Sequence, residues 1–174
     1  SSRAGLALDA LGAASLEWLT GLTATLLTEG VPHPPLYSAL DGLLEAMSLG
    51  VDPARAMAGV ARYELLLMTE LGFGPDLSNC VVTGVTTDLA YVSPKSSHAV
   101  SRGAGLPYAS RLLPLPALLL GADDAPSWDD VAAALHTTGY FLERDMLTGR
   151  LAALLAARTR LTSLIARQQD AAVR

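Results

Sequence analysis

The feature that most constrains the fold is a segment in the middle of the chain, residues 72–105, where helical periodicity stops and glycine, proline, serine and threonine recur. On both sides of it, apolar residues recur at the three- and four-residue spacing of a buried helix face. Most of these residues are alanine and leucine, which favour helix over strand. The chain of 174 residues is 51% hydrophobic, enough for one domain with a sizeable core. The sequence therefore predicts a mainly α, bundle-like domain interrupted by a small irregular insertion.

Prolines, helix-capping residues and glycines indicate where the predicted helices begin and end. Proline is tolerated at a first helical position, aspartate and serine cap helix starts, and glycine caps helix ends. The third predicted helix is apolar around most of its circumference, so it should be the central one. The predicted helices run from Ala10 to about Leu27, from near Pro35 to Met47, from Asp52-Pro53 to Leu71 before Gly72, from Ser127-Trp128 to about Met146, and from about Leu151 to Arg167, with a frayed tail after it.

Two short β-prone pieces lie inside the irregular segment. They are Leu89 to Ser93 and His98 to Ser101, and Pro94 to Ser97 supply the turn between them. We expect a small β-hairpin subdomain, with an insertion that extends over residues 72–116.

Cysteine usage and hydropathy limit the setting of the protein. A single cysteine, Cys80, cannot form an internal disulfide, and no secretory leader opens the chain, so a cytoplasmic location is expected. Asp9 and Glu17 interrupt the first apolar run, and the run from Leu112 to Leu120 is too short to cross a bilayer and holds two prolines. No membrane role is expected.

The charge distribution is uneven. The net charge is −5, which argues against a protein whose whole surface binds nucleic acid. Residues 1–90 hold three basic and ten acidic side chains, whereas residues 91–174 hold nine and seven. A contact with a polyanion should lie in the second half, although ordinary scatter of surface charge explains the asymmetry equally well.

An ordered set of short motifs in the central segment carries a family resemblance. The motifs are Arg62-Tyr63-Glu64-Leu65-Leu66-Leu67, Leu71-Gly72-Phe73-Gly74, Asp76-Leu77, Cys80, Gly84, Tyr91-Val92-Ser93-Pro94-Lys95 and Leu112-Leu113-Pro114-Leu115-Pro116. In this order and spacing they resemble the C-terminal region of RecO, a bacterial mediator of DNA repair and recombination. The resemblance is strongest from Arg62 to Pro116 and faint after Met146.

The resemblance implies a domain organisation and a role. RecO-like proteins carry an N-terminal OB-fold before the helical region, so residues 1–8 would be a leftover linker from a missing OB-fold and residues 9–174 the helical domain. The implied role is to bind RecR and the tail of single-stranded-DNA-binding protein, to promote RecA loading and to anneal strands. A stand-alone helical protein-interaction domain of another pathway is the alternative, and a cysteine-dependent hydrolase is a more distant one.

The resemblance also bears on metal binding. Many RecO-like proteins carry two C-x-x-C pairs in this region, and a structural zinc site needs four cysteine or histidine ligands. Here only Cys80 remains, and the other three positions align with Thr83, Ser101 and Ala104. We therefore expect a former zinc-finger-like subdomain that binds no metal and needs no cofactor.

No motif indicates an enzyme. Cys80 lacks a recognisable base among His33, His98 and His136, so a structural thiol is the favoured interpretation. Gly72-Phe73-Gly74 lacks the spacing and lysine of a phosphate-binding loop. Asp123-Asp124 and Asp129-Asp130 are adjacent pairs whose side chains diverge, as expected of solvated carboxylates.

Two groups of cations are candidate binding residues. Lys95, Arg102 and Arg111 lie on or beside the irregular segment with Tyr91 and Tyr108 between them, a combination that suits single-stranded DNA because cations hold phosphates and aromatic rings stack on bases. The candidate nucleic-acid-binding residues are thus Lys95, Arg102, Tyr108 and Arg111. Ordinary surface charge, with the tyrosines in the core, is the alternative.

The second group is a pair on the third predicted helix. Arg55 and Arg62 are seven residues apart, so they share one face, and they are the only basic residues between Arg3 and Lys95. An apolar groove edged by two arginines suits an acidic peptide that ends in an aromatic residue and a carboxylate, such as the tail named above. Pairing of Arg62 with Glu17 or with acids near Glu64 is the alternative.

Overall fold

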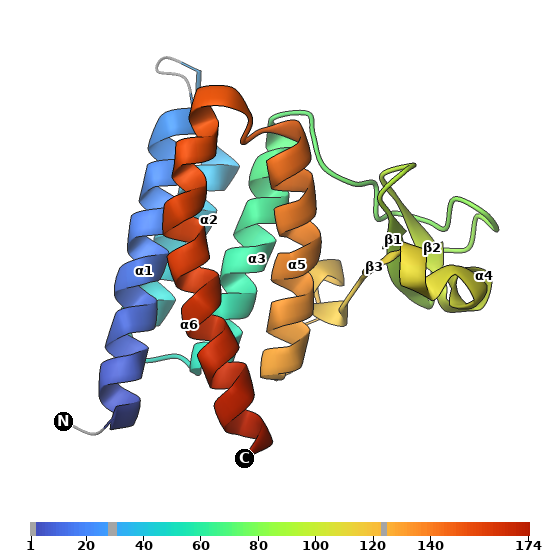
Figure 1. The fold of residues 1–174 in the computed structure, drawn as a ribbon. Helices are drawn as coiled ribbons and strands as arrows, with labels where there is room; N and C mark the ends of the chain where they lie inside the picture. Colours follow the sequence, from blue (N-terminus) through green and yellow to red (C-terminus); the bar gives the residue numbers. More distant parts are fainter. Residues whose placement is uncertain (1–2, 28–30, 123–124) are drawn as a thin grey trace.

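The computed structural model describes residues 3–27, 31–122 and 125–174. Long helices pack side by side as a bundle, and a small sheet with short helices projects from one side of it (Figure 1). The prediction of a mainly α domain with a small β insertion is confirmed.

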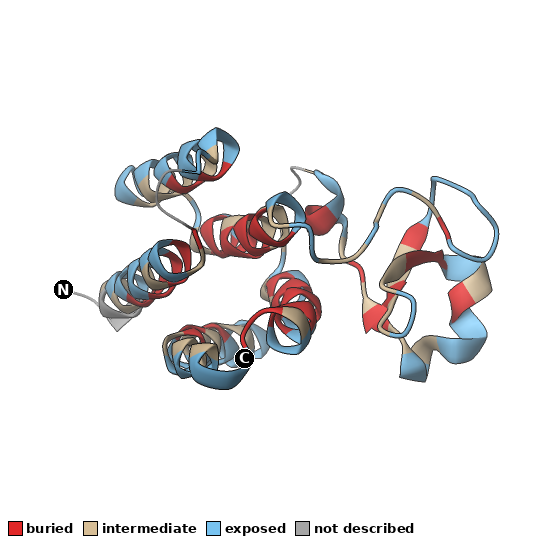
Figure 2. Ribbon diagram, turned by 90° about the horizontal axis from the view of Figure 1, so that it is seen from above, coloured by how far each residue is buried: buried red, intermediate tan, exposed pale blue. Residues whose placement is uncertain are grey.

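Helix α3, Pro53–Glu70, is the centre of the bundle. Asp52 caps it by accepting a hydrogen bond from the Arg55 backbone N–H at 3.2 Å, and Gly72 follows its C-cap with φ +84°. Ten of its residues are buried, and α3 packs on both α2 and α5. Buried residues line the inner sides of the surrounding helices (Figure 2). The predicted central position of this helix is therefore confirmed.

Helices α1, Arg3–Leu26, and α2, Pro34–Ser48, complete the first half. Helix α1 begins seven residues before the predicted Ala10, so the residues from Arg3 to Leu8 are helical. Residues 1 and 2 lie outside the described residues.

Helices α5, Trp128–Asp145, and α6, Leu155–Val173, form the second half, joined by the 3-10 helix η3, Gly149–Leu154. A capping box fixes the start of α5, because Ser127 and Asp130 each bond the other's backbone N–H. Helix α6 starts later and extends further than the predicted Leu151–Arg167, since no glycine or proline follows Arg167 to stop it.

The insertion contains a three-stranded antiparallel sheet of order β2-β1-β3. Strands β1, Leu89–Ser93, and β2, His98–Ser101, match the predicted hairpin, and β3, Leu113–Pro114, pairs with the other edge of β1. The sequence did not predict β3 or the short helices α4, Arg102–Gly105, η1, Leu106–Arg111, and η2, Ala117–Leu120.

Two side chains of α5 attach the insertion to the bundle. The Thr137 hydroxyl donates a hydrogen bond to the Pro114 carbonyl at 2.6 Å. Arg144 donates to the Pro94 carbonyl at 2.7 Å and to Ser97 Oγ at 2.8 Å, and its guanidinium lies 4.9 Å from the centre of the Phe141 ring. The β1–β2 turn is thus bound to the C-terminal end of α5.

None of the helices in the described part of the chain is long and apolar enough to cross a membrane.

Candidate functional site: a groove edged by two arginines

The start of α3 determines where the two predicted arginines lie. The Asp52 cap and Pro53 at the first helical position fix the first turn, so Arg55 falls in that turn and Arg62 two turns later. Both side chains line one groove between α2 and α3, with a cavity volume of about 360 Å³. The structure thus brings together the two residues that were predicted as a pair.

Apart from the two arginines, the groove is lined mainly by apolar residues. Gly59 allows α2 to approach closely, because a Cβ at this position would lie 2.6 Å from Leu43 Cδ1. The remaining lining residues come from both helices and the turn between them: Ala39, Leu43, Ala46, Val51, Ala56, Tyr63 and Leu66. An apolar channel with charged edges can accept an apolar side chain and hold a carboxylate beside it.

Arg62 has a structural role that the sequence did not predict. Its Nε donates to the Leu118 carbonyl at 2.8 Å and one terminal nitrogen donates to the Ala122 carbonyl at 2.9 Å. These carbonyls belong to η2 and the turn after it, so Arg62 connects α3 to the segment that returns from the insertion. The alternative pairing of Arg62 with Glu17 or with acids near Glu64 is wrong, because Glu17 pairs with Arg160 and Glu64 with Arg158.

Tyr63 closes the inner side of the groove. Its hydroxyl forms a hydrogen bond with Thr23 of α1, which ties the groove wall to the bundle. Burial raises the pKa of Tyr63, and the Thr23 hydrogen bond opposes that rise. The tyrosine therefore stays neutral and acts as a fixed wall.

The predicted nucleic-acid-binding residues all lie in the insertion, but they do not cluster at one site. Lys95 is exposed in the β1–β2 turn, whereas Arg102 begins α4 at the opposite end of β2 and pairs with Asp88 at 3.1 Å. Tyr108 is 57% exposed in η1, and the exposed Arg111 ends that helix. The side chains are accessible, but they are spread over the length of the hairpin.

Tyr91 differs from Tyr108 because it packs inside the insertion. A Cβ at residue 105 would lie 2.4 Å from the Tyr91 ring, so the ring covers Gly105. For this tyrosine the core interpretation holds.

Cys80 is buried, with only 1% of its surface exposed. Its sulfur accepts a hydrogen bond from the Ser101 backbone N–H at 3.2 Å, and Ser101 Oγ in turn accepts from the Ala104 backbone N–H at 3.4 Å. Burial opposes ionisation, but hydrogen bonds from Thr83 and Ser101 lower the Cys80 pKa to about 6. Hydrogen bonds therefore join the positions that the resemblance aligned with zinc ligands.

The four positions that the resemblance aligns with zinc ligands carry one cysteine, one threonine, one serine and one alanine. Within residues 3–27, 31–122 and 125–174, no group of three or more histidine, cysteine or acidic side chains is placed to hold a metal ion. The nearby His98 has its Nε2 at 3.2 Å from Asn79 Oδ1.

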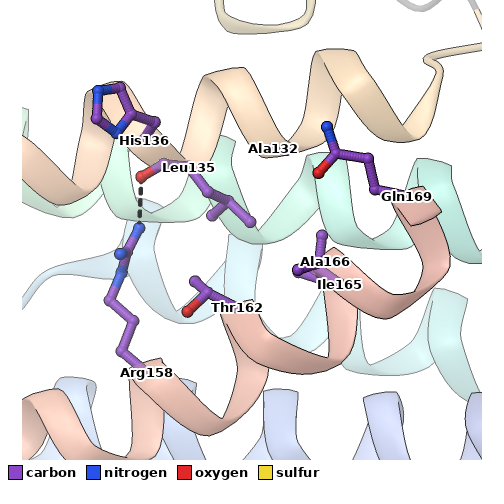
Figure 3. Close-up of a pocket in the computed structure, with 8 residues that line it drawn as sticks. All are labelled: Ala132, Leu135, His136, Arg158, Thr162, Ile165, Ala166 and Gln169. Carbon is purple, nitrogen blue, oxygen red and sulfur yellow. Dashed lines mark hydrogen bonds between the residues drawn. The ribbon is translucent and has the colours of Figure 1, made fainter.

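A second cavity of about 250 Å³ lies between α5 and α6, beside Arg158 (Figure 3). Arg158 donates from Nε and a terminal nitrogen to the two carboxylate oxygens of Glu64 at 2.8 and 2.9 Å, and to the Leu135 carbonyl at 2.8 Å. Because Glu64 neutralises this arginine, its charge is not available to a ligand in the cavity.

Glu64 itself is fully buried, at 0% exposure. Besides Arg158 it accepts hydrogen bonds from Trp18 Nε1 at 2.9 Å and Thr138 Oγ1 at 2.6 Å. The network connects α1, α3, α5 and α6. Sequence reasoning missed it, although a glutamate within the most buried helix was the available signal.

Comparison with known proteins supports the family resemblance that the motifs indicate. Residues 7–153 match the family model described as "Recombination protein O C terminal". The DNA repair protein RecO of Bradyrhizobium sp. (strain ORS 278) is 44% identical over 152 residues, which cover 80% of this chain and 60% of that protein.

Further relatives agree. The DNA repair protein RecO of Afipia carboxidovorans is 44% identical over 149 residues, covering 84% of this chain and 59% of the relative. That of Sinorhizobium medicae is 45% identical over 130 residues, covering 75% and 51%. The chain therefore spans about half to three fifths of the length of these relatives. No solved structure gave a significant match. By its sequence and its helical fold, the chain belongs to the RecO family and corresponds to the C-terminal region of that family.

Proposed function

We propose that this chain is the helical partner-binding part of a DNA repair and recombination mediator, and that it acts by binding rather than by catalysis. The family match and the printed names of the relatives support the repair role. The burial of Cys80 supports a binding role, because a nucleophilic thiol must reach its substrate.

The observation that carries the proposal is the apolar groove with Arg55 and Arg62 at its edges. We propose that it receives the acidic, aromatic-ended tail of single-stranded-DNA-binding protein. The apolar lining would take the aromatic ring, and a guanidinium would bind the terminal carboxylate through charge-assisted hydrogen bonds. Capture of this tail would place the domain on coated single strands, where RecR binding, RecA loading and strand annealing would follow.

The two arginines are proposed to contribute differently. Arg55 is exposed in the first turn of α3 and lines the groove, so a peptide in the groove can reach its guanidinium. Two nitrogens of Arg62 already bind the Leu118 and Ala122 carbonyls, so Arg62 also shapes the groove.

Titration of a labelled tail peptide by fluorescence anisotropy tests the proposal. Loss of one charge-assisted contact costs about 1.5 to 3 kcal/mol, or roughly tenfold to a hundredfold in affinity. We expect Arg55→Ala to weaken binding by this factor and, because Arg55 is exposed, to lower the free energy of unfolding by less than about 1 kcal/mol. Arg62→Ala should weaken binding and also lower the free energy of unfolding.

The matched control is Arg111→Ala, which removes an exposed arginine outside the groove and should bind the peptide like wild type. Blocking the peptide carboxylate as an amide should weaken binding to wild type but leave Arg55→Ala nearly unaffected. If both groove variants bind like wild type, the groove is not the site. If wild type ignores the peptide, the chain does not bind this tail.

We also propose that single-stranded DNA binds weakly to the insertion through Lys95, Arg102, Tyr108 and Arg111. Their exposure and their mix of cations with an aromatic ring support this contact.

A further inference from the structure

Helix α6 carries an arginine stripe, which we define as Arg160, Arg167 and Arg174. Seven residues turn an α-helix to within about 20° of its starting direction, so these side chains leave the helix on nearly one line. From first to last the stripe covers about 21 Å at 1.5 Å per residue. It lies beyond residues 7–153, the part of the chain that the family model matches.

The stripe faces solvent because α6 buries a different side. Helix α6 packs on α1 and α5 (Figure 1), where Arg158, Leu161 and Ile165 are buried. Arg160, Arg167 and Arg174 are all exposed. Arg160 pairs with Glu17 of α1. In the described part of the chain, no acidic side chain forms an ion pair with Arg167 or Arg174.

The local charge is opposite to that of the chain. Residues 149–174 hold five arginines and one aspartate, a net +4, in a chain of net −5. Exposed helices often balance their cations with acids three or four residues away. Around Arg167 these positions are Ser163, Leu164, Asp170 and Ala171, so only one is acidic and two are small. Of the five arginines, Arg158 pairs with Glu64 and Arg160 with Glu17. Arg167 and Arg174 are exposed, and Asp170 is the one acidic residue three or four positions from either of them, so their positive charge is only partly compensated.

We propose that the arginine stripe binds the phosphate backbone of single-stranded DNA. A linear row of cations at regular spacing is complementary to a chain of phosphates, and the absence of aromatic side chains from α6 indicates contact with the backbone rather than with bases. The proposal rests on the DNA-repair role proposed above, but its site is separate from both the groove and the insertion.

Binding of a labelled oligothymidine strand, measured by anisotropy over a series of salt concentrations, tests the stripe. The variant is the double substitution Arg167→Ala and Arg174→Ala, which removes two exposed side chains and should change stability little. Each lost single-strand phosphate contact lowers the slope of log K against log salt by about 0.7. We expect weaker binding at low salt and a slope that is smaller by about 1.4.

The double substitution Arg167→Lys and Arg174→Lys keeps the charge and should keep the slope. Arg55→Ala serves as the matched control, because it should weaken binding of the tail peptide and leave DNA binding unchanged. The proposal is wrong if the alanine double variant binds DNA with wild-type affinity and salt slope. It is also wrong if the lysine double variant binds DNA as poorly as the alanine double variant, or if wild type binds no DNA.

Binding of the tail peptide distinguishes this proposal from the proposal for the groove. The Arg167→Ala and Arg174→Ala double variant should bind the peptide like wild type. If the double variant binds the peptide more weakly but binds DNA like wild type, the stripe is a peptide-binding surface and our proposal is wrong. If the peptide never binds but the DNA results hold, the groove assignment fails and the stripe stands.

Discussion

The bundle and the insertion hold their polar groups together in different ways. In the bundle one buried ion pair, Glu64 with Arg158, collects hydrogen bonds from α1 and α5 into a single network. In the insertion the polar contacts are local and mostly involve the backbone, as where the Ser101 N–H reaches Cys80. The comparison indicates that the polar network of the bundle joins residues far apart in the sequence, whereas the polar contacts within the insertion join residues closer together.

The largest expected effect is in the bundle network. Arg158→Met leaves the buried Glu64 carboxylate without its counter-charge, which should lower the free energy of unfolding by about 3 to 5 kcal/mol. Urea denaturation followed by tryptophan fluorescence measures the loss, since Trp18 donates to Glu64.

Two controls sharpen this test. Arg160→Met, two residues away, removes the exposed pair with Glu17 and should cost less than about 1 kcal/mol. Adding Glu64→Gln to Arg158→Met should recover part of the loss, because no buried charge remains. A loss as small as that of Arg160→Met would show that the bundle does not depend on the network.

The contrast also explains what sequence could predict. The hairpin strands were found at their true residues because proline and serine mark the turn between them. The pairing of Glu64 with Arg158 was not found, since the two residues are 94 positions apart and no local pattern connects them. Strand β3 was missed because proline is unfavourable in strands; Pro114 is tolerated only because β3 lies at the sheet edge.

In the candidate site, too, local spacing was predictable from the sequence and long-range contacts were not. The seven-residue spacing of Arg55 and Arg62 predicted a shared helix face, and both line one groove. The hydrogen bonds of Arg62 to η2 could not be predicted, because they require the chain to return from the insertion to α3. The arginine stripe was visible as spacing, but its exposure depends on which side of α6 packs against α1 and α5.

An intermediate effect is expected where the two regions meet. Arg144→Ala removes the hydrogen bonds to Pro94 and Ser97 and should destabilise the β1–β2 turn by about 1 kcal/mol. Hydrogen exchange should then be roughly fivefold faster at the Ser97 and Asp76 amides, which bond the Ser93 and Ser97 carbonyls. Amides in the middle of α3 should be unchanged.

Arg102→Ala is the matched control for this attachment, because Arg102 pairs with Asp88 inside the insertion and does not reach α5 in the described structure. Its exchange rates at Ser97 and Asp76 should equal those of wild type. Faster exchange throughout α3 in Arg144→Ala would mean that the two regions unfold as one unit.

The smallest expected effect is that of metal removal on the insertion. Of the four former ligand positions, only Cys80 carries a thiol; Thr83 and Ser101 carry hydroxyls and Ala104 a methyl group. A closed zinc site needs four nitrogen or sulfur ligands. Chelation should therefore leave the melting temperature unchanged, and protein purified without chelator should contain no stoichiometric zinc by elemental analysis.

A positive control is the triple variant Thr83→Cys, Ser101→Cys and Ala104→Cys, which should bind zinc and melt at a lower temperature after chelation. A fall of several degrees in wild type would show that a metal, and not hydrogen bonding, holds the insertion together.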